Sequence, residues 1–477
     1  MSGALTAGGH RPDTRGVPLI AVLIVGAAVL IGLAAGDPAP QWWGPLAILA
    51  GGAVFYAGAR WPFASLLLML GSSILLVVVQ ASGTRAVNLI DLLLPPVLLV
   101  SAFGRARRDA HEDLETGAAH GGLRAAERRL TGAVILFYVA AACSLVQLAR
   151  IAGTSAALDS GLVLIRALQG LALYPLCIWW LRTRACVEKV WVALAVAGAL
   201  LVLVNLIGVA AWGTTRAGMA VYLNDPAAPI ASPNEAGTAT LVVGVVLLVR
   251  QTMRPDWKNL ALGALMLLLL ALTRSRSGLL AWATFALLTL RWVRPGRLLA
   301  GALGLAALLP LVPVDYWTRM VRSAAVERGS FEAYSFFVRV YGWQTAWKVV
   351  QDHPWTGIGY LGFRFVSHQY NELRLVLITV ENYFYEILVG MGAVGLTLLA
   401  LVFVRLFQLG REVGRVAPPG TLAHAMARFH APFVLALLVA NMTGDNFVGM
   451  VSVAQMAIWS AVLVRSGHAA VAEAARA

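Results

Sequence analysis

Long uninterrupted runs of apolar residues constrain this chain more than any other feature of its sequence. A membrane-spanning helix needs about 20 consecutive, mostly apolar residues, and shorter spans also occur. Runs of this kind recur along all 477 residues, of which 59% are hydrophobic and 13% charged. A soluble domain carries about 25% charged residues, and no aqueous fold could bury this much apolar surface. We therefore expect an all-α polytopic membrane protein.

The number of spans follows from the runs themselves. Several of the later runs are short, so we expect 12–14 transmembrane helices, with one or two of them re-entrant. The runs lie at residues 18–36, 42–59, 62–80, 86–104, 131–149, 161–181, 190–212, 236–250, 259–273, 278–292, 298–314, 380–407, 430–446 and 449–465.

The basic residues orient these helices. The net charge of +14 comes from 37 Lys and Arg against 23 Asp and Glu, an excess that would suggest nucleic acid in a soluble protein. In a membrane protein the same excess arises because cytoplasmic loops retain Lys and Arg. Arginine clusters here occupy every second loop. We therefore expect no nucleic-acid partner, and both termini in the cytoplasm.

Three regions are expected along the chain. Residues 1–314 form a transmembrane bundle, with a charged cytoplasmic loop at 105–130 and an outer loop at 213–235. Residues 315–379 form an extracytoplasmic cap loop, and residues 380–477 form the C-terminal transmembrane helices and a cytoplasmic tail. Loops as long as this cap are uncommon and are mostly functional.

The cap contains an apolar stripe at helical spacing. Its members recur at intervals of four and three residues and are Phe336, Val340, Trp343, Trp347 and Val350. This pattern predicts an amphipathic helix that begins near Arg339 and lies at the membrane interface or packs on the bundle.

Several arginines are expected on the outer side of the membrane. Arg216 follows the seventh run, and Arg274 and Arg276 lie between two Leu-rich runs. Charges at such depth cost about 2.5–3.5 kcal/mol each on the insertion scale and face a cavity or a partner. One interpretation of Arg274 and Arg276 is a structural pair with a carboxylate of Glu235, Glu381 or Asp445. The other is a clamp for a lipid-linked phosphate or diphosphate, because guanidinium groups bind phosphate oxygens bidentately.

A longer motif lies in the cap. The segment Arg339-Val-Tyr-Gly-Trp343, then Ala346, and then His353-Pro354 with Gly357 and Gly359, resembles the signature of the O-antigen ligase and Wzy-type polysaccharide polymerase superfamily. Shorter segments of that signature occur in the same order over roughly residues 200–400. They are Arg216-Ala-Gly218, Ser232-Pro-Asn234, Ser275-Arg276, and Glu381-Asn382-Tyr383 followed by Gly392 and Gly395.

The resemblance implies a fold related to the membrane-embedded GT-C glycosyltransferases. It further implies a glycan donor on undecaprenyl diphosphate, a glycan or lipid-linked acceptor, and transfer with inversion at the outer face of the bacterial cytoplasmic membrane. Neither a nucleotide sugar, a metal nor another cofactor is required. A chain-length regulator protein is a further expected partner, beside membrane lipid.

The resemblance also implies roles for particular residues. Arg216 and Arg339 match the arginines that hold the diphosphate, and Arg276, with Arg274, is a further contributor or a structural brace. Family ligases have His before the Asn of the last motif, where this chain has Glu381. A positioned carboxylate can serve as general base for an acceptor hydroxyl. Glu381 is therefore expected to be the base, with a structural pairing to arginine as the alternative.

The remaining candidates are weaker. They are expected to contact substrate or acceptor and are Asn234, Asn382, Tyr383, His353 and His368. Asn382 and Tyr383 would orient sugar hydroxyls, and His368 is a second candidate base. For His353 we favour a role in the turn that ends the cap helix, and for Gly357 and Gly359 a tight turn. For the tryptophans we favour packing over stacking on sugars.

Three functions stay open. The preferred one is polymerisation of lipid-linked repeat units of a surface polysaccharide, because Glu381 replaces the histidine of the ligases. The second is a ligase that transfers glycan to a lipid A core sugar or to protein. The third is a transporter or flippase of lipid-linked sugars, which would perform no covalent chemistry.

Overall fold

The computed structural model describes residues 43–75, 78–79, 87–106, 118–181, 184–212, 233–273, 275–292, 331–444 and 450–476. The N-terminal helices are α2 (Trp43–Arg60), α3 (Pro62–Leu75), α4 (Leu89–Ala106), α5 (Ala118–Ala152), α6 (Thr154–Trp180) and α7 (Arg184–Trp212). The later helices are α9 (Pro233–Met253), α10 (Trp257–Thr273), α11 (Arg276–Thr289), η1 (Leu290–Trp292), α14 (Phe331–Asp352), α15 (Phe363–Tyr370), α16 (Tyr383–Val416), α17 (Leu422–Met442) and α18 (Met450–Arg476).

The structure confirms an all-α polytopic membrane protein. Among the described residues, six helices are long and apolar enough to cross a membrane, or up to seven if one bent pair counts as a span. A two-stranded antiparallel pair, β1 (Val78–Val79) and β2 (Val87–Asn88), joins α3 to α4. The expected runs at 18–36 and 298–314 lie outside the described residues, so 12–14 spans stays a prediction.

The bent pair corresponds to the expected runs 42–59 and 62–80. Its two apolar parts, Gly52–Arg60 and Pro62–Ser73, meet at 113°. Pro62 occupies the first position of α3, where its missing N–H and fixed φ are tolerated. The two runs therefore form a broken span or a re-entrant loop.

Two expected boundaries are wrong. The loop predicted at 105–130 is helical from Ala118, because α5 continues well beyond its apolar segment. Glu127 in this extension accepts a hydrogen bond from Tyr174 Oη at 2.9 Å, so a packed neighbour supports the charged turns. The cap helix α14 begins at Phe331, eight residues before Arg339, and α15 was not foreseen.

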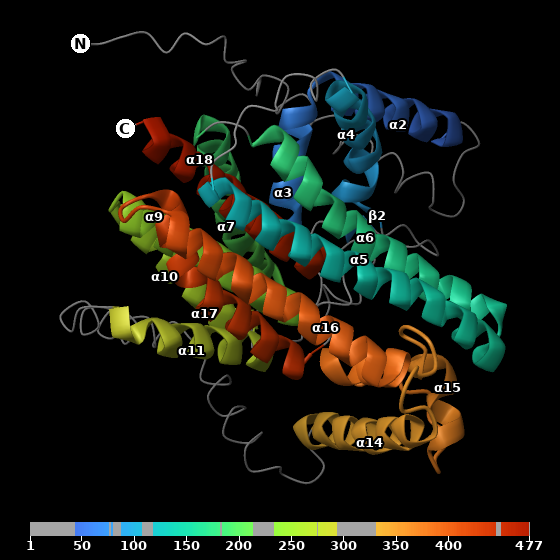
Figure 1. Cartoon of the computed structure of the whole chain (residues 1–477). Coiled ribbons are helices and arrows are strands. Elements are labelled where there is room, and N and C mark those ends of the chain that lie inside the picture. The colour runs from blue at the N-terminus through green and yellow to red at the C-terminus, as the bar shows by residue number, and fades with distance from the viewer. Residues whose placement is uncertain are drawn as a thin grey trace, which may run out of the picture.

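The C-terminal helices lie between the two earlier groups of helices. As Figure 1 shows, α16 runs along α5 while α17 lies beside α11, and α18 also packs against α6. Small residues permit the closest approaches: a Cβ at Gly244 of α9 would lie 2.2 Å from the ring of Trp282 of α11. Because these contacts join segments distant in sequence, one large apolar core runs through the bundle.

The cap lies at one end of the bundle, where α14 and α15 contact α16 (Figure 1). A second, smaller core joins the cap to the start of α16 and is formed by Ala346, Val349, Val350, Ile358, Phe363, Val366, Leu377, Val380 and Val389. Of the predicted stripe, Val350 is buried, whereas Trp343 and Trp347 are 38% and 52% exposed. A position of these two rings at the membrane interface stays a prediction. Ala346 and Val349 of the same helix are fully buried. The side chain of Phe336 lies outside the described residues.

Candidate active site

Arg339 and Glu381 form an ion pair at the junction of the cap and the bundle. Arg339 Nε donates to Glu381 Oε2 across 42 positions of sequence. The two side chains are 25% and 38% exposed, so solvent or a ligand can reach both. Nε is one of five guanidinium N–H donors. The pair therefore places a carboxylate and a cation together at an accessible surface.

Glu381 sits in a tight turn that precedes α16. Its φ of +51° is left-handed, a conformation that costs a non-glycine residue about 1–3 kcal/mol. Neighbouring groups hold this turn: Glu381 N donates to Thr379 Oγ1 at 3.1 Å, and Trp343 Nε1 of α14 donates to Val380 O at 3.0 Å. Several contacts therefore determine where the Glu381 carboxylate points.

A second carboxylate, Glu386, braces the same turn from α16. Its residue is 3% exposed and its Oε2 accepts the N–H of Val380 at 3.1 Å. Asn382 begins α16 as its N-cap, and its Oδ1 accepts the N–H of Tyr385 at 3.1 Å. Glu386 was not predicted from the sequence. A carboxylate four residues after an N-cap, inside an apolar span, would have indicated a site there. Asn382 thus has a structural role in addition to any substrate contact.

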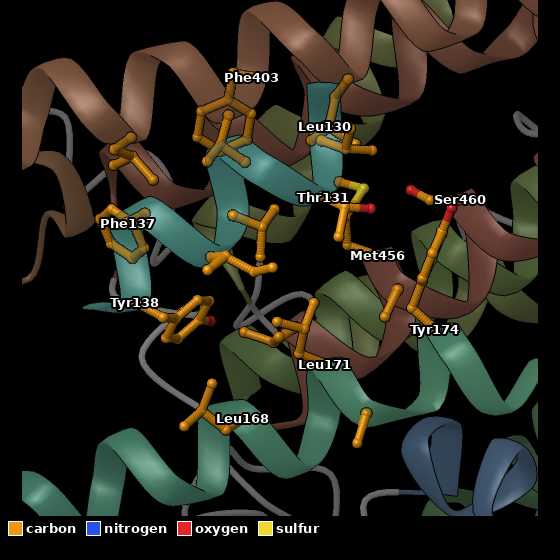
Figure 2. A pocket seen from close by; sticks show the side chains of 18 of the residues that line it. Leu130, Thr131, Phe137, Tyr138, Leu168, Leu171, Tyr174, Phe403, Met456 and Ser460 are labelled. Carbon is orange, nitrogen blue, oxygen red and sulfur yellow. The ribbon is translucent and has the colours of Figure 1, made fainter. Parts of the chain in front are cut away.

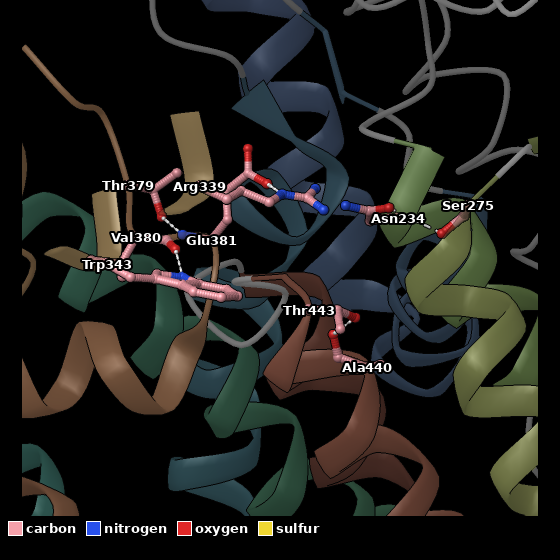
Figure 3. A network of polar contacts seen from close by, with 9 residues as sticks. All are labelled: Asn234, Ser275, Arg339, Trp343, Thr379, Val380, Glu381, Ala440 and Thr443. Atoms are coloured by element: carbon pink, nitrogen blue, oxygen red, sulfur yellow. Dashed lines mark hydrogen bonds and ion pairs between the residues drawn. The ribbon is translucent and has the colours of Figure 1, made fainter. Parts of the chain in front are cut away.

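Asn234 and Ser275 join two further elements to this region. Asn234 lies in the first turn of α9, and its Oδ1 accepts a hydrogen bond from Ser275 Oγ at 3.0 Å. Ser275 is the N-cap of α11 and accepts the N–H of Gly278. In Figure 3 the guanidinium of Arg339 and the side chain of Asn234 point toward one another. Residues from α9, α11, α14 and the start of α16 therefore face a common region.

The starts of α9 and α11 are in direct contact. A Cβ added at Gly278 would lie 2.9 Å from Gly237 Cα, and one added at Gly237 would lie 3.1 Å from Gly278 Cα. Only glycines allow two first turns to approach this closely. The N-terminus of each helix carries a partial positive charge and unpaired N–H groups. Two such ends side by side favour an anion.

The predicted arginines are only partly described. Arg276 is the first residue of α11 and is exposed beside its N-cap Ser275. It is thus at the same helix start as the Asn234 contact. Arg216 and Arg274 lie outside the described residues, as does most of the predicted outer loop at 213–235.

The other three predicted contacts have different surroundings. Tyr383 is buried, with its N–H bonded to Gly444 O at 3.1 Å, and its side chain lines an apolar cavity. His353 lies 14 positions beyond Arg339, which is about 21 Å along the helix axis. His368 is in the last turn of α15. In the described part of the chain, neither histidine bonds to Arg339 or Glu381.

His353 instead belongs to the turn that ends α14, as favoured from the sequence. Its N–H donates to Val349 O at 2.9 Å, and its carbonyl accepts the N–H of Gly357 at 3.2 Å. The predicted tight turn at Gly357 and Gly359 is confirmed, with φ of +64° and +108°. Tyr360 is packed and buried, whereas Trp343, Trp347 and Trp355 are exposed, so packing of these tryptophans beside the membrane stays a prediction.

This turn is inserted into a break in α16. Ile358 N and Gly359 N donate to the carbonyls of Val389 and Gly390 at 3.1 and 2.7 Å. In return, Ala393 N donates to Pro354 O at 2.8 Å. The break occurs at Gly392, whose φ is +63°. The N–H of Gly359 donates to α16 and that of Gly357 donates to His353 O. Because both N–H groups have protein partners, the two glycines serve structure and not phosphate binding.

The fold and the site define a class of protein: an all-α polytopic membrane protein with a polar, cationic site where a cap meets the bundle. Residues 261–400 match the model of the O-antigen ligase family, which supports the resemblance of the sequence motifs to the O-antigen ligase and Wzy-type polymerase superfamily. The matched range includes Ser275, Arg276, Arg339 and Glu381, whereas Arg216 and Asn234 precede it. None of the curated proteins compared with the chain matches it.

Proposed function

We propose that this chain is an inverting, metal-independent glycosyltransferase that moves glycan from undecaprenyl diphosphate to an acceptor hydroxyl. The O-antigen ligase domain supports a membrane ligase- or polymerase-type activity. The observation that carries the finer proposal is the Arg339–Glu381 pair beside the starts of α9 and α11. This arrangement offers positive charge to a diphosphate and a carboxylate to a hydroxyl.

Cleavage of the donor leaves negative charge on the lipid diphosphate. The acceptor oxygen forms a bond to the anomeric carbon while the bond from that carbon to the phosphate oxygen breaks. Arg339 and the helix N-termini stabilise the developing charge, because positioned cations and dipoles act most strongly at the transition state. Arg276 adds a second cation at the start of α11. Arg216 and Arg274 are proposed as further diphosphate ligands.

The acceptor hydroxyl must lose its proton as the new bond forms. We assign this proton to Glu381, whose carboxylate is accessible and held in a fixed turn. Its pairing with Arg339 places the base beside the diphosphate ligand. Asn234 and Asn382 have amide groups at the same region to orient sugar hydroxyls. Glu386 acts as a positioning residue through Val380.

The location of the site supports an outer-face reaction. The site lies where α9, α11 and α16 begin, whereas basic residues lie where they end: Arg250 in α9, Arg291 in η1 and Arg415 in α16. Membrane proteins retain basic residues on the cytoplasmic side. We therefore place Glu381 on the outer side and both chain termini in the cytoplasm.

Polymerisation of repeat units is the preferred reaction, because a carboxylate stands where the family ligases have histidine. The test is incubation of the full-length protein in nanodiscs with a lipid-linked repeat unit, with and without a lipid A core acceptor. A ladder of longer lipid-linked products indicates a polymerase, and transfer to the core acceptor indicates a ligase. The absence of any product under both conditions would contradict glycosyl transfer and favour transport.

Arg339→Ala tests the diphosphate ligand in the same assay. Loss of a positioned donor of this kind lowers kcat by about 10²–10³. Lys348→Ala is the matched control, since Lys348 is an exposed cation on the same helix. We expect the control to keep wild-type turnover. Equal turnover in both variants would exclude Arg339 as a ligand.

A further inference from the structure

An apolar cavity of about 420 Å³ lies inside the bundle. It is enclosed by α5, α6, α16 and α18, whose side chains converge on it in Figure 2. Phe137, Leu171, Phe403 and Met456 are among its walls. This volume is within the range of small-molecule sites, about 300–1,000 Å³. Cavities with apolar walls stay dry and accept hydrocarbons.

The cavity is adjacent to the polar site through Tyr383. This residue lines the cavity and is the first residue of α16, two positions after Glu381. Its ring lies 6.2 Å from that of Phe384, which lies 6.2 Å from Phe403 on the cavity wall. A molecule with a polar head at Arg339 could therefore place its apolar part beside Tyr383.

The cavity also has an opening at the level of the membrane. Ile135 of α5 and Leu168 of α6 are among its lining residues and are both exposed. Both helices are apolar enough to span a membrane, so this opening faces lipid hydrocarbon. A chain can enter here laterally without passing through water.

We propose that this cavity binds the polyprenyl chain of the lipid-linked donor. The inference rests on the proposed function, since it joins the cavity to the diphosphate site at Arg339. A single amphiphile would then place its phosphates at the helix N-termini and the isoprene units nearest to them along Tyr383. The apolar walls contribute affinity in proportion to the hydrocarbon that they bury. An acyl chain of a bulk phospholipid is the competing occupant.

Photo-cross-linking tests the occupant without requiring turnover. The probe is a polyprenyl diphosphate with a diazirine on an isoprene unit near the phosphates, added to the full-length protein in nanodiscs. We expect labelled peptides from α5, α6, α16 and α18, and competition by unlabelled polyprenyl diphosphate but not by excess phospholipid. Labelling outside the cavity alone, or competition by phospholipid, would overturn the proposal.

A variant that fills the cavity provides the second arm. Ala172→Phe introduces a ring into the cavity from α6, and Ala142→Phe places the same ring on the exposed surface of α5. Displacement of two buried methylenes lowers affinity by about tenfold. We therefore expect Ala172→Phe to lose about tenfold in labelling and Ala142→Phe to lose none. Equal labelling in both variants would contradict the proposal.

Two controls make failure interpretable. If Ala172→Phe does not fold, Val402→Phe fills the same cavity from α16. Transfer activity is measured separately on a short-chain donor, which does not need the cavity. Specific labelling of the cavity without transfer from any donor would support polyprenyl binding in the cavity and count against the proposed glycosyl transfer. Failure of the cavity proposal and failure of the proposed function are therefore distinguishable.

Discussion

At the scale of single residues, the site depends on one carboxylate held in an unfavourable backbone conformation. Glu381 keeps a left-handed φ because Thr379, Trp343 and Glu386 hold the turn around it. Such strain persists only where the surroundings impose it, and it clusters at functional sites. The same carboxylate can either accept a proton or only orient Arg339, and a substitution separates the two roles.

Glu381→Gln keeps an oxygen that accepts the Arg339 Nε hydrogen bond and removes the proton acceptor. If Glu381 is the base, we expect kcat to fall by about 10²–10⁴ while KM for the donor changes little. Steady-state kinetics with a lipid-linked donor provide the measurement. Glu372→Gln, which alters an exposed carboxylate of the same cap, should be neutral. Unchanged kcat in Glu381→Gln would restrict Glu381 to positioning Arg339.

At the scale of elements, the notable feature is the insertion of the cap turn into the break of α16. The break frees backbone groups at Val389 and Gly390, and the N–H groups of Ile358 and Gly359 bond to them. Backbone groups near a membrane interior must find partners within the protein. Gly357 and Gly392, which match the family signature, are therefore needed where the backbones of the cap turn and α16 come into contact. By fixing the cap on α16, they also support the Glu381 turn indirectly.

Gly392→Ala tests this contact. A Cβ at Gly392 would lie 2.2 Å from the carbonyl carbon of Trp355, and the φ of Gly392 is +63°. Overpacking and left-handed strain together predict that Gly392→Ala lowers the free energy of unfolding by about 2–5 kcal/mol. Gly420→Ala is the control, because its φ is +82° and nothing lies within 4 Å of a Cβ there. Thermal unfolding should show a clearly smaller loss for Gly420→Ala; equal losses would mean that the steric contact is unimportant.

At the scale of the whole molecule, one end of the bundle is polar and capped and the other is basic. The starts of α9, α11 and α16 share the first end. Basic residues lie toward the second end, with Arg250 in the last turn of α9, Arg291 in η1 and Arg415 in the last turn of α16. This polarity supports the proposed placement of the site on the outer side of the membrane.

Single cysteines test this orientation. In a background without Cys143, Cys177 and Cys186, we expect Glu372→Cys in the cap to react with a membrane-impermeant maleimide in intact cells. Lys258→Cys, at the basic end beside the start of α10, should react only after permeabilisation. The reverse pattern would place the site in the cytoplasm and contradict the proposed reaction.

The sequence alone determined the membrane class, most helices and the residues of the pair, because apolar runs and residue types are local properties. Tyr383 shows the limit, since its motif predicts a sugar contact and its packing places it in an apolar cavity. The buried face of α14, the helical start of the 105–130 segment and the bracing by Glu386 likewise depended on distant neighbours. Only the tertiary structure decided these features. Burial and pairing depend on which elements pack against one another, and local periodicity does not specify those contacts.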